Sequence, residues 1–113
     1  MPKKVFYGDL IQITEIQKIF AGNPKVTVET KKILSVFGNE SSSSKDTKIK
    51  GVALGNGGLV FTFKDGRHIL NIGSEFSISK IKPQQTRWQS ASAMVITKVS
   101  FTNSIGERVT IIR

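Results

Sequence analysis

A single histidine, His68, is the chain's main candidate for acid–base or metal chemistry. The 113 residues otherwise offer eight carboxylates and no cysteine. A catalytic histidine needs a nucleophile and an orienting group, and a metal ion needs several ligands. The nearest acidic residue in sequence, Asp65, precedes Gly66 in a pattern typical of a turn. We therefore predict no catalytic, cofactor-binding or metal-ligating residue, and we expect that the protein is not an enzyme.

The glycine-rich run Gly55–Gly58 has the composition of a phosphate-binding loop. Such loops follow a strand and open a helix, whose first backbone amides bind the anion. Here the run is followed by alternating apolar residues, which predict a strand where the helix should be. The run is therefore interpreted as a turn.

Basic residues outnumber acidic ones by seventeen to eight, which gives the chain a formal net charge of +9. A small body with this charge attracts nucleic acid and other polyanions, and also acidic protein surfaces. The basic residues are spread along the chain and do not form one basic helix. The candidates for contact with a polyanion or a partner are Lys3, Lys4, Lys45, Lys48, Lys50, Lys64, Arg67 and Arg87.

Aromatic residues are expected in two different environments. Phe61 and Phe63 alternate on one predicted strand, and apolar neighbours in the predicted pairing favour the core over a base-stacking surface. Tyr7 and Trp88 lie in more polar surroundings, where a large aromatic side chain often anchors a protein interface. We therefore predict Tyr7 and Trp88 as interface anchors.

The segment 59–72 predicts a β-hairpin. Asp65 and Gly66 suit a two-residue turn whose central residues both have positive φ. Closing the hairpin there places Phe61 opposite Leu70 and gathers the apolar side chains on one face. The turn residues and the apolar pattern thus agree.

A second hairpin is predicted at the C-terminal end of the sequence. Apolar residues alternate over 95–101, and the segment 104–106 offers a three-residue loop with Gly106 in the left-handed position. This loop places Phe101 opposite Val109.

Residues 10–21 predict a short helix, with Asp9 as N-cap and Gln12 at the capping-box position. The apolar face of this helix would comprise Leu10, Ile13, Ile16 and Phe20. Many residues in the segment are β-branched, so a strand remains open as the alternative. Residues 25–37 then predict one long bent strand or two short ones.

The whole pattern predicts a mainly β protein: a small antiparallel barrel or sandwich of six to seven strands with one short N-terminal helix. We expect one domain over residues 1–113, with a basic N-terminal tail at 1–4. Residues 38–51 are rich in serine and lysine and predict a surface loop.

Two functions fit this pattern. The leading hypothesis is a non-catalytic structural protein, a basic β-scaffold subunit that contacts copies of itself or other subunits in an ordered assembly, such as a virion component of the capsid-decorating or connector type. The alternative is a small-barrel, OB-like module that binds single-stranded nucleic acid through Lys64, Arg67 and the lysines of 38–51. No secretion signal or membrane span is predicted, and we expect an intracellular or virion location.

Overall fold

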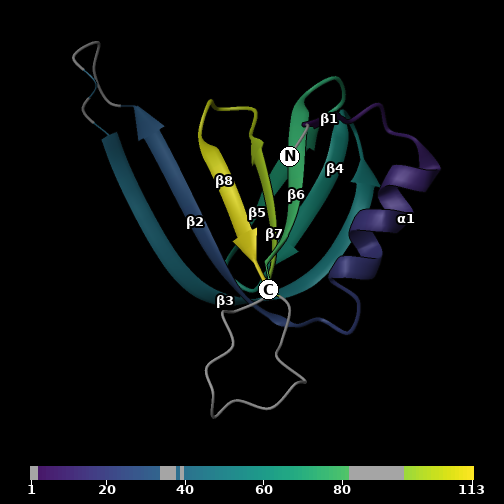
Figure 1. Cartoon of the computed structure of the whole chain (residues 1–113), viewed down its shortest axis with the longest axis horizontal. Helices are drawn as coiled ribbons and strands as arrows, with labels where there is room; N and C mark the ends of the chain where they lie inside the picture. The colour runs from purple at the N-terminus through teal and green to yellow at the C-terminus, as the bar shows by residue number, and fades with distance from the viewer. Residues whose placement is uncertain (1–2, 34–37, 39, 82–95) are drawn as a thin grey trace.

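The computed structural model describes the chain except for residues 1–2, 34–37, 39 and 82–95. One helix and eight antiparallel strands form a strongly curved sheet, a half-barrel, in the order β1-β6-β7-β8-β2-β3-β4-β5 (Figure 1). The elements are β1 (Lys4–Val5), α1 (Leu10–Ile19), β2 (Lys25–Ile33), β3 (Glu40–Gly55), β4 (Gly58–Phe63), β5 (Gly66–Asn71), β6 (Glu75–Ile81), β7 (Ile96–Thr102) and β8 (Arg108–Ile112). The predicted mainly β fold with a short N-terminal helix is confirmed. The described strands exceed the predicted six to seven, and the two-residue β1 is one of them.

Helix α1 begins where the sequence predicts, because the side chain of Asp9 accepts a hydrogen bond of 2.9 Å from the N–H of Ile11. The predicted capping box does not form. Instead, the Gln12 side chain accepts from the N–H of Tyr7 at 3.0 Å and donates to the C=O of Val5 at 2.8 Å. Gln12 therefore ties the helix to the segment around β1.

The helix contributes one face to the core of the half-barrel. Ile13, Ile16 and Phe20 are buried as predicted, whereas Leu10 is 76% exposed. The remaining core side chains come from the inward-facing positions of the strands and from Phe6; they are Val26, Val28, Ile49, Val52, Leu59, Phe61, Phe63, Leu70, Phe76, Val99, Phe101, Val109 and Ile111. The prediction that Leu10 belongs to the buried face is wrong, because this first residue of α1 lines an open groove beside β6 and β7.

The prediction of a surface loop over residues 38–51 is wrong, because the sixteen-residue strand β3 begins at Glu40. Its serines pair with β2, and the hydroxyls of Thr30 and Ser43 lie 2.6 Å apart across the two strands. A register irregularity between Ile49 and Gly51 then lets β3 bend from β2 to β4. Figure 1 shows β3 on the outer side of β2 at the left of the half-barrel, curving at its lower end towards β4.

The hairpin β4–β5 forms, but its predicted turn is wrong. Phe61 pairs with His68 instead of Leu70, and the turn residues are Lys64 and Asp65. The register shift is an even number of residues, so the apolar side chains stay on the predicted face.

The cause of this shift lies in β3. The carboxylate of Asp65 accepts a hydrogen bond of 3.0 Å from the Thr47 hydroxyl and forms an ion pair with Lys45. The N–H of Lys64 donates to the C=O of Lys48 at 3.0 Å. These contacts hold the turn against a strand distant in sequence, and they outweigh the local preference for a turn centred on Asp65 and Gly66.

The C-terminal hairpin is confirmed in register and in loop. Phe101 pairs with Val109, and Gly106 has a φ of 83°. The N–H of Asn103 donates to the C=O of Glu107 at 2.9 Å, which closes the three-residue loop. A side chain other than glycine would be strained at this φ.

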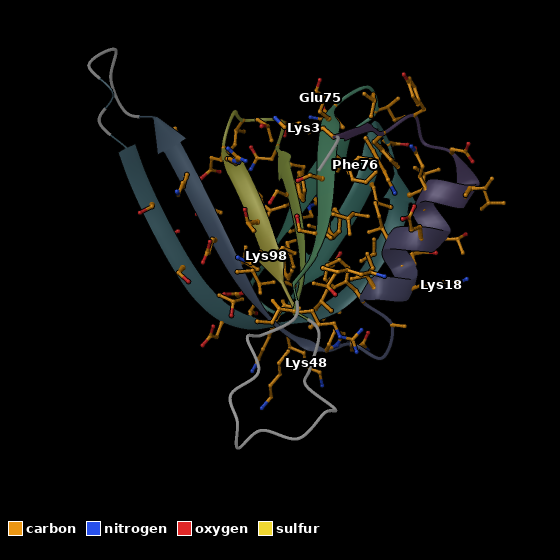
Figure 2. All side chains as sticks on the ribbon, in the orientation of Figure 1. Lys3, Lys18, Lys48, Glu75, Phe76 and Lys98 are labelled. Carbon is orange, nitrogen blue, oxygen red and sulfur yellow. The ribbon has the colours of Figure 1, made fainter. Side chains whose placement is uncertain are left out.

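The predicted basic tail at 1–4 is wrong for its described part. Lys4 belongs to β1, where it pairs with Phe76, and its ammonium lies 2.9 Å from the carboxylate of Glu15. Lys3 forms an ion pair of 3.9 Å with Glu75, and the two residues are adjacent in Figure 2. Both lysines are therefore held on the body of the protein.

Candidate functional site

Five basic residues from β2, β3, the β4–β5 turn and β5 gather at one end of the half-barrel. Lys25 and Lys48 are directly opposite each other on β2 and β3, and the turn residue Lys64 is bonded through its N–H to the Lys48 carbonyl. Lys50 lies at the irregularity of β3, next to Gly51. Thr62 of β4 pairs with Gly51 on one side and with Arg67 of β5 on the other, so Arg67 lies in the same region of the sheet. We name this surface the basic strip: Lys25, Lys48, Lys50, Lys64 and Arg67. Figure 2 shows Lys48 at the lower end of the half-barrel.

The charges of the basic strip are not balanced by ion pairs within the described residues. All five side chains are exposed. Like charges placed directly opposite each other on neighbouring strands repel, as Lys25 and Lys48 do here. An anion bound between them relieves this repulsion, so the basic strip is suited to a polyanion.

The structure separates the predicted contact lysines into two groups. Lys48, Lys50, Lys64 and Arg67 belong to the basic strip, whereas Lys3, Lys4 and Lys45 are each paired with a carboxylate of the chain. Lys25 was missed by the sequence because only the β2–β3 register brings it to Lys48. Arg87 lies outside the described residues.

The second candidate surface is an apolar groove between α1 and the adjoining ends of β6 and β7, with a volume of about 1010 Å³. We name it the α1 groove, and its lining residues are Leu10, Ile11, Thr14, Glu15, Lys18, Ile19, Ile78, Lys80, Ile96, Thr97 and Arg113. Leu10 and Ile11 are each 76% exposed. Water therefore contacts aliphatic side chains on the outer face of a helix whose other face is already in the core.

Cations surround this apolar surface. Lys18, Lys80 and Arg113 line the groove, while its one acidic residue, Glu15, is paired with Lys4. Figure 2 shows Lys18 extending outward from α1. The groove thus combines aliphatic walls with a positively charged border.

The predicted interface anchors have different outcomes. Tyr7 is 72% exposed, as an anchor requires, although its contact with a partner stays a prediction. Trp88 lies outside the described residues. Phe61 and Phe63 are buried in the core, as the sequence predicts.

His68 lies in a small polar pocket of about 230 Å³ beside the β2–β3 hairpin. Its Nδ1 is 3.4 Å from the side-chain amide of Asn103, which also donates to the Glu107 carboxylate at 3.3 Å. The described residues hold no cluster of three or more side chains that could bind a metal ion. The His68 ring thus packs beside Asn103 and lies edge-on to Phe63, with ring centroids 5.9 Å apart.

Lowering the pH should weaken folding through His68. Burial lowers its pKa below the usual value of about 6.5, and the negative charge of Glu107 opposes this effect. The folded state therefore binds the proton less readily than the unfolded chain, and stability is lost as the pH falls below about 6.5 towards the folded-state pKa. The denaturant concentration that unfolds half of the wild-type protein should be lower at about pH 5.5 than at about pH 7.5. This decrease should be smaller for His68→Gln. An identical pH dependence of the two proteins would contradict this assignment.

Comparison of the chain with protein-family models, with curated proteins and with solved structures found no match. The described part of the chain has no helix of the length and apolar character needed to cross a membrane. We therefore infer function from the basic strip, the α1 groove and the strand edges.

Proposed function

We propose that the protein is a non-catalytic interaction protein, a basic β-scaffold subunit of a larger ordered assembly, of the capsid-decorating or connector type of a virion. The observation that carries the proposal is the α1 groove, where Leu10 and Ile11 leave most of their surface in water. Large contiguous apolar surface on a soluble domain is typical of a protein–protein contact. The half-barrel supplies the rigid body on which this contact surface is held.

The border of the groove specifies the chemistry of the neighbouring subunit. Three cations, Lys18, Lys80 and Arg113, flank the aliphatic walls. A matching surface therefore presents apolar side chains at its centre and carboxylates at its rim. Opposite charges at the rim set the orientation of such a contact, while the buried aliphatic side chains contribute most of the binding free energy.

Replacing Ile11 by serine should weaken self-association without weakening the fold. Ile11 is exposed in the free chain, so its loss costs little in folding. Burying it against a neighbour contributes about 1.5–3 kcal/mol, so the association constant should fall about tenfold or more. Light scattering across a concentration series measures this change. Leu54→Ser, at an exposed position outside the groove, is the control. Equal association by both variants would contradict the proposed role of the groove.

A second function is favoured by the basic strip. Its five cations suit the phosphates of a nucleic acid, as in the OB-like alternative, and binding by such a surface is strongly dependent on salt. Base stacking, however, needs an exposed aromatic ring beside the phosphates. Phe61 and Phe63 are in the core, and the exposed Tyr7 lies between β1 and α1, outside the elements of the basic strip. We therefore propose for this second function a contact with the phosphate backbone, independent of base sequence.

A further inference from the structure

The N-terminal part of β3 has an open edge. Over Glu40–Lys48 this strand pairs with β2 on one side, and β4 pairs with it only from Ile49 onward. On the other side, the described residues supply no strand beside Glu40–Thr47, whereas the Lys48 carbonyl already accepts from the turn residue Lys64. Residues 41–46 are all exposed, and Figure 1 shows this part of β3 on the outer side of β2.

The hydrogen bonds at the bend show which backbone groups point to the open edge. The N–H of Ile49 donates to the Pro24 carbonyl on the β2 side, at 3.1 Å. The C=O of Lys48 accepts from Lys64 on the opposite side, at 3.0 Å. Because successive residues of a strand direct their backbone groups to opposite sides, Ser42, Ser44 and Asp46 direct theirs to the open edge, as Lys48 does. An edge strand with such groups is a template for another strand.

We propose that two copies of this chain pair antiparallel through the open edge of β3, with Ser44 opposite Ser44 of the second copy. This inference rests on the proposed function and names one of the subunit contacts. In this register Ser42 lies opposite Asp46 of the second copy. The hydrogen-bonded pairs are then formed by Ser42, Ser44 and Asp46, whose backbone groups point to the open edge. The two curved sheets join into one.

Charge favours this register over the symmetric alternatives centred on residues 45 and 46. With Ser44 at the two-fold axis, Lys45 lies opposite Ser43 and Asp46 lies opposite Ser42, so no like charges face each other. Moving the axis to residue 45 places Lys45 opposite itself, and moving it to residue 46 places Asp46 opposite itself. Both moves set like charges against each other, which destabilises a strand pair.

Charged side chains on edge strands often prevent pairing, and Lys45 and Asp46 are two such residues on this edge. Here the Lys45 ammonium is ion-paired with Asp65 of the same chain. Its charge is therefore balanced in each copy. The four consecutive serines Ser41–Ser44 are small and uncharged, and they leave both faces of the edge accessible.

Two lysine substitutions test the register. Ser44→Lys places two lysines opposite each other at the two-fold axis, whereas Ser42→Lys places each lysine opposite Asp46 of the second copy. Within the chain, Ser44 faces Glu29 and Ser42 faces Lys31, so S44K stabilises its own hairpin more than S42K does. A weaker dimer in S44K therefore cannot arise from a weaker hairpin.

Sedimentation equilibrium of the full chain gives the dissociation constant of each variant. We expect S44K to dimerise about tenfold more weakly than S42K. The S44K dimer contains one pair of like charges at the axis, whereas the S42K dimer contains two pairs of opposite charges. Equal constants, or a weaker dimer in S42K, would overturn the inference. A chain that associates equally in both variants but more weakly as Ile11→Ser overturns this edge contact and leaves the proposed function standing. A wild type that stays monomeric overturns this edge contact and also overturns self-association as part of the proposed function.

A cysteine at the axis gives an independent readout, since the chain has no cysteine of its own. Facing residues of a hydrogen-bonded antiparallel pair lie about 5.5 Å apart between Cα atoms, within the range of a disulfide. Ser44→Cys should form a covalent dimer under mild oxidation much faster than Ser104→Cys, which is exposed in the β7–β8 loop. Equal rates would count against the proposed contact.

Discussion

Replacing Phe61 by alanine should lower the free energy of unfolding by about 3–5 kcal/mol. The Phe61 side chain is fully buried and connects three elements. Its ring stacks on Phe101 of β7 with centroids 5.1 Å apart, and it meets Phe20 at the end of α1 edge-on at 6.0 Å. The substitution removes the transfer free energy of the ring and leaves a cavity between helix and sheet. Chemical denaturation followed by circular dichroism measures the loss.

Leu54→Ala is the matched control for Phe61→Ala, because Leu54 lies on the neighbouring β3 and is 52% exposed. Its loss should cost less than about 1 kcal/mol. A Phe61→Ala variant with the stability of this control would show that the ring is not at the centre of the core. The alternation that places Phe61 on the inner face of β4 would then also be in doubt.

Replacing Lys25 and Lys48 together by glutamine should weaken binding to a single-stranded oligonucleotide and flatten its salt dependence. Each phosphate contact on a single strand contributes about 0.7 to the magnitude of the slope of log K against log salt. The slope of the double variant should therefore be smaller in magnitude by about 1.4. The two lysines are adjacent and without a carboxylate partner among the described residues. Fluorescence polarisation from about 50 mM salt upward measures the slope.

Lys3 and Lys4, replaced together by glutamine, give the control for the basic strip. This variant loses the same charge, but these lysines are paired with Glu75 and Glu15. Its slope should stay close to that of the wild type. Equal effects of the two double variants would indicate general attraction by the net charge and not binding at the basic strip. A flat titration of the wild type at low salt would remove the second function altogether.

The features that the sequence predicts correctly depend on neighbouring residues. The cap at Asp9 needs only the N–H of Ile11, and the C-terminal hairpin needs only Gly106 and the alternation on either side of it. The apolar faces of β4 and β5 are predicted correctly although the register is not. Alternation determines the face on which each side chain lies, but it does not determine which residue of the neighbouring strand lies opposite.

The errors arise where distant segments compete with local preferences. The turn at Asp65 changes because Thr47, which precedes it by eighteen residues, holds its carboxylate. The serines of β3 have the composition of a loop, yet pairing with β2 makes them a strand. For the candidate site, sequence identified most of the basic strip but not Lys25, and it missed the α1 groove because periodicity placed Leu10 in the core.

The mass of the wild-type protein in solution tests the central claim, that this chain is a subunit which associates with copies of itself. Light scattering coupled to size-exclusion chromatography should be run from about 1 µM to about 500 µM, the range over which moderate affinities are resolved. We predict a mass that rises with concentration from that of the 12.4 kDa chain to at least twice that value. A mass that stays at one chain over the whole range would contradict the account.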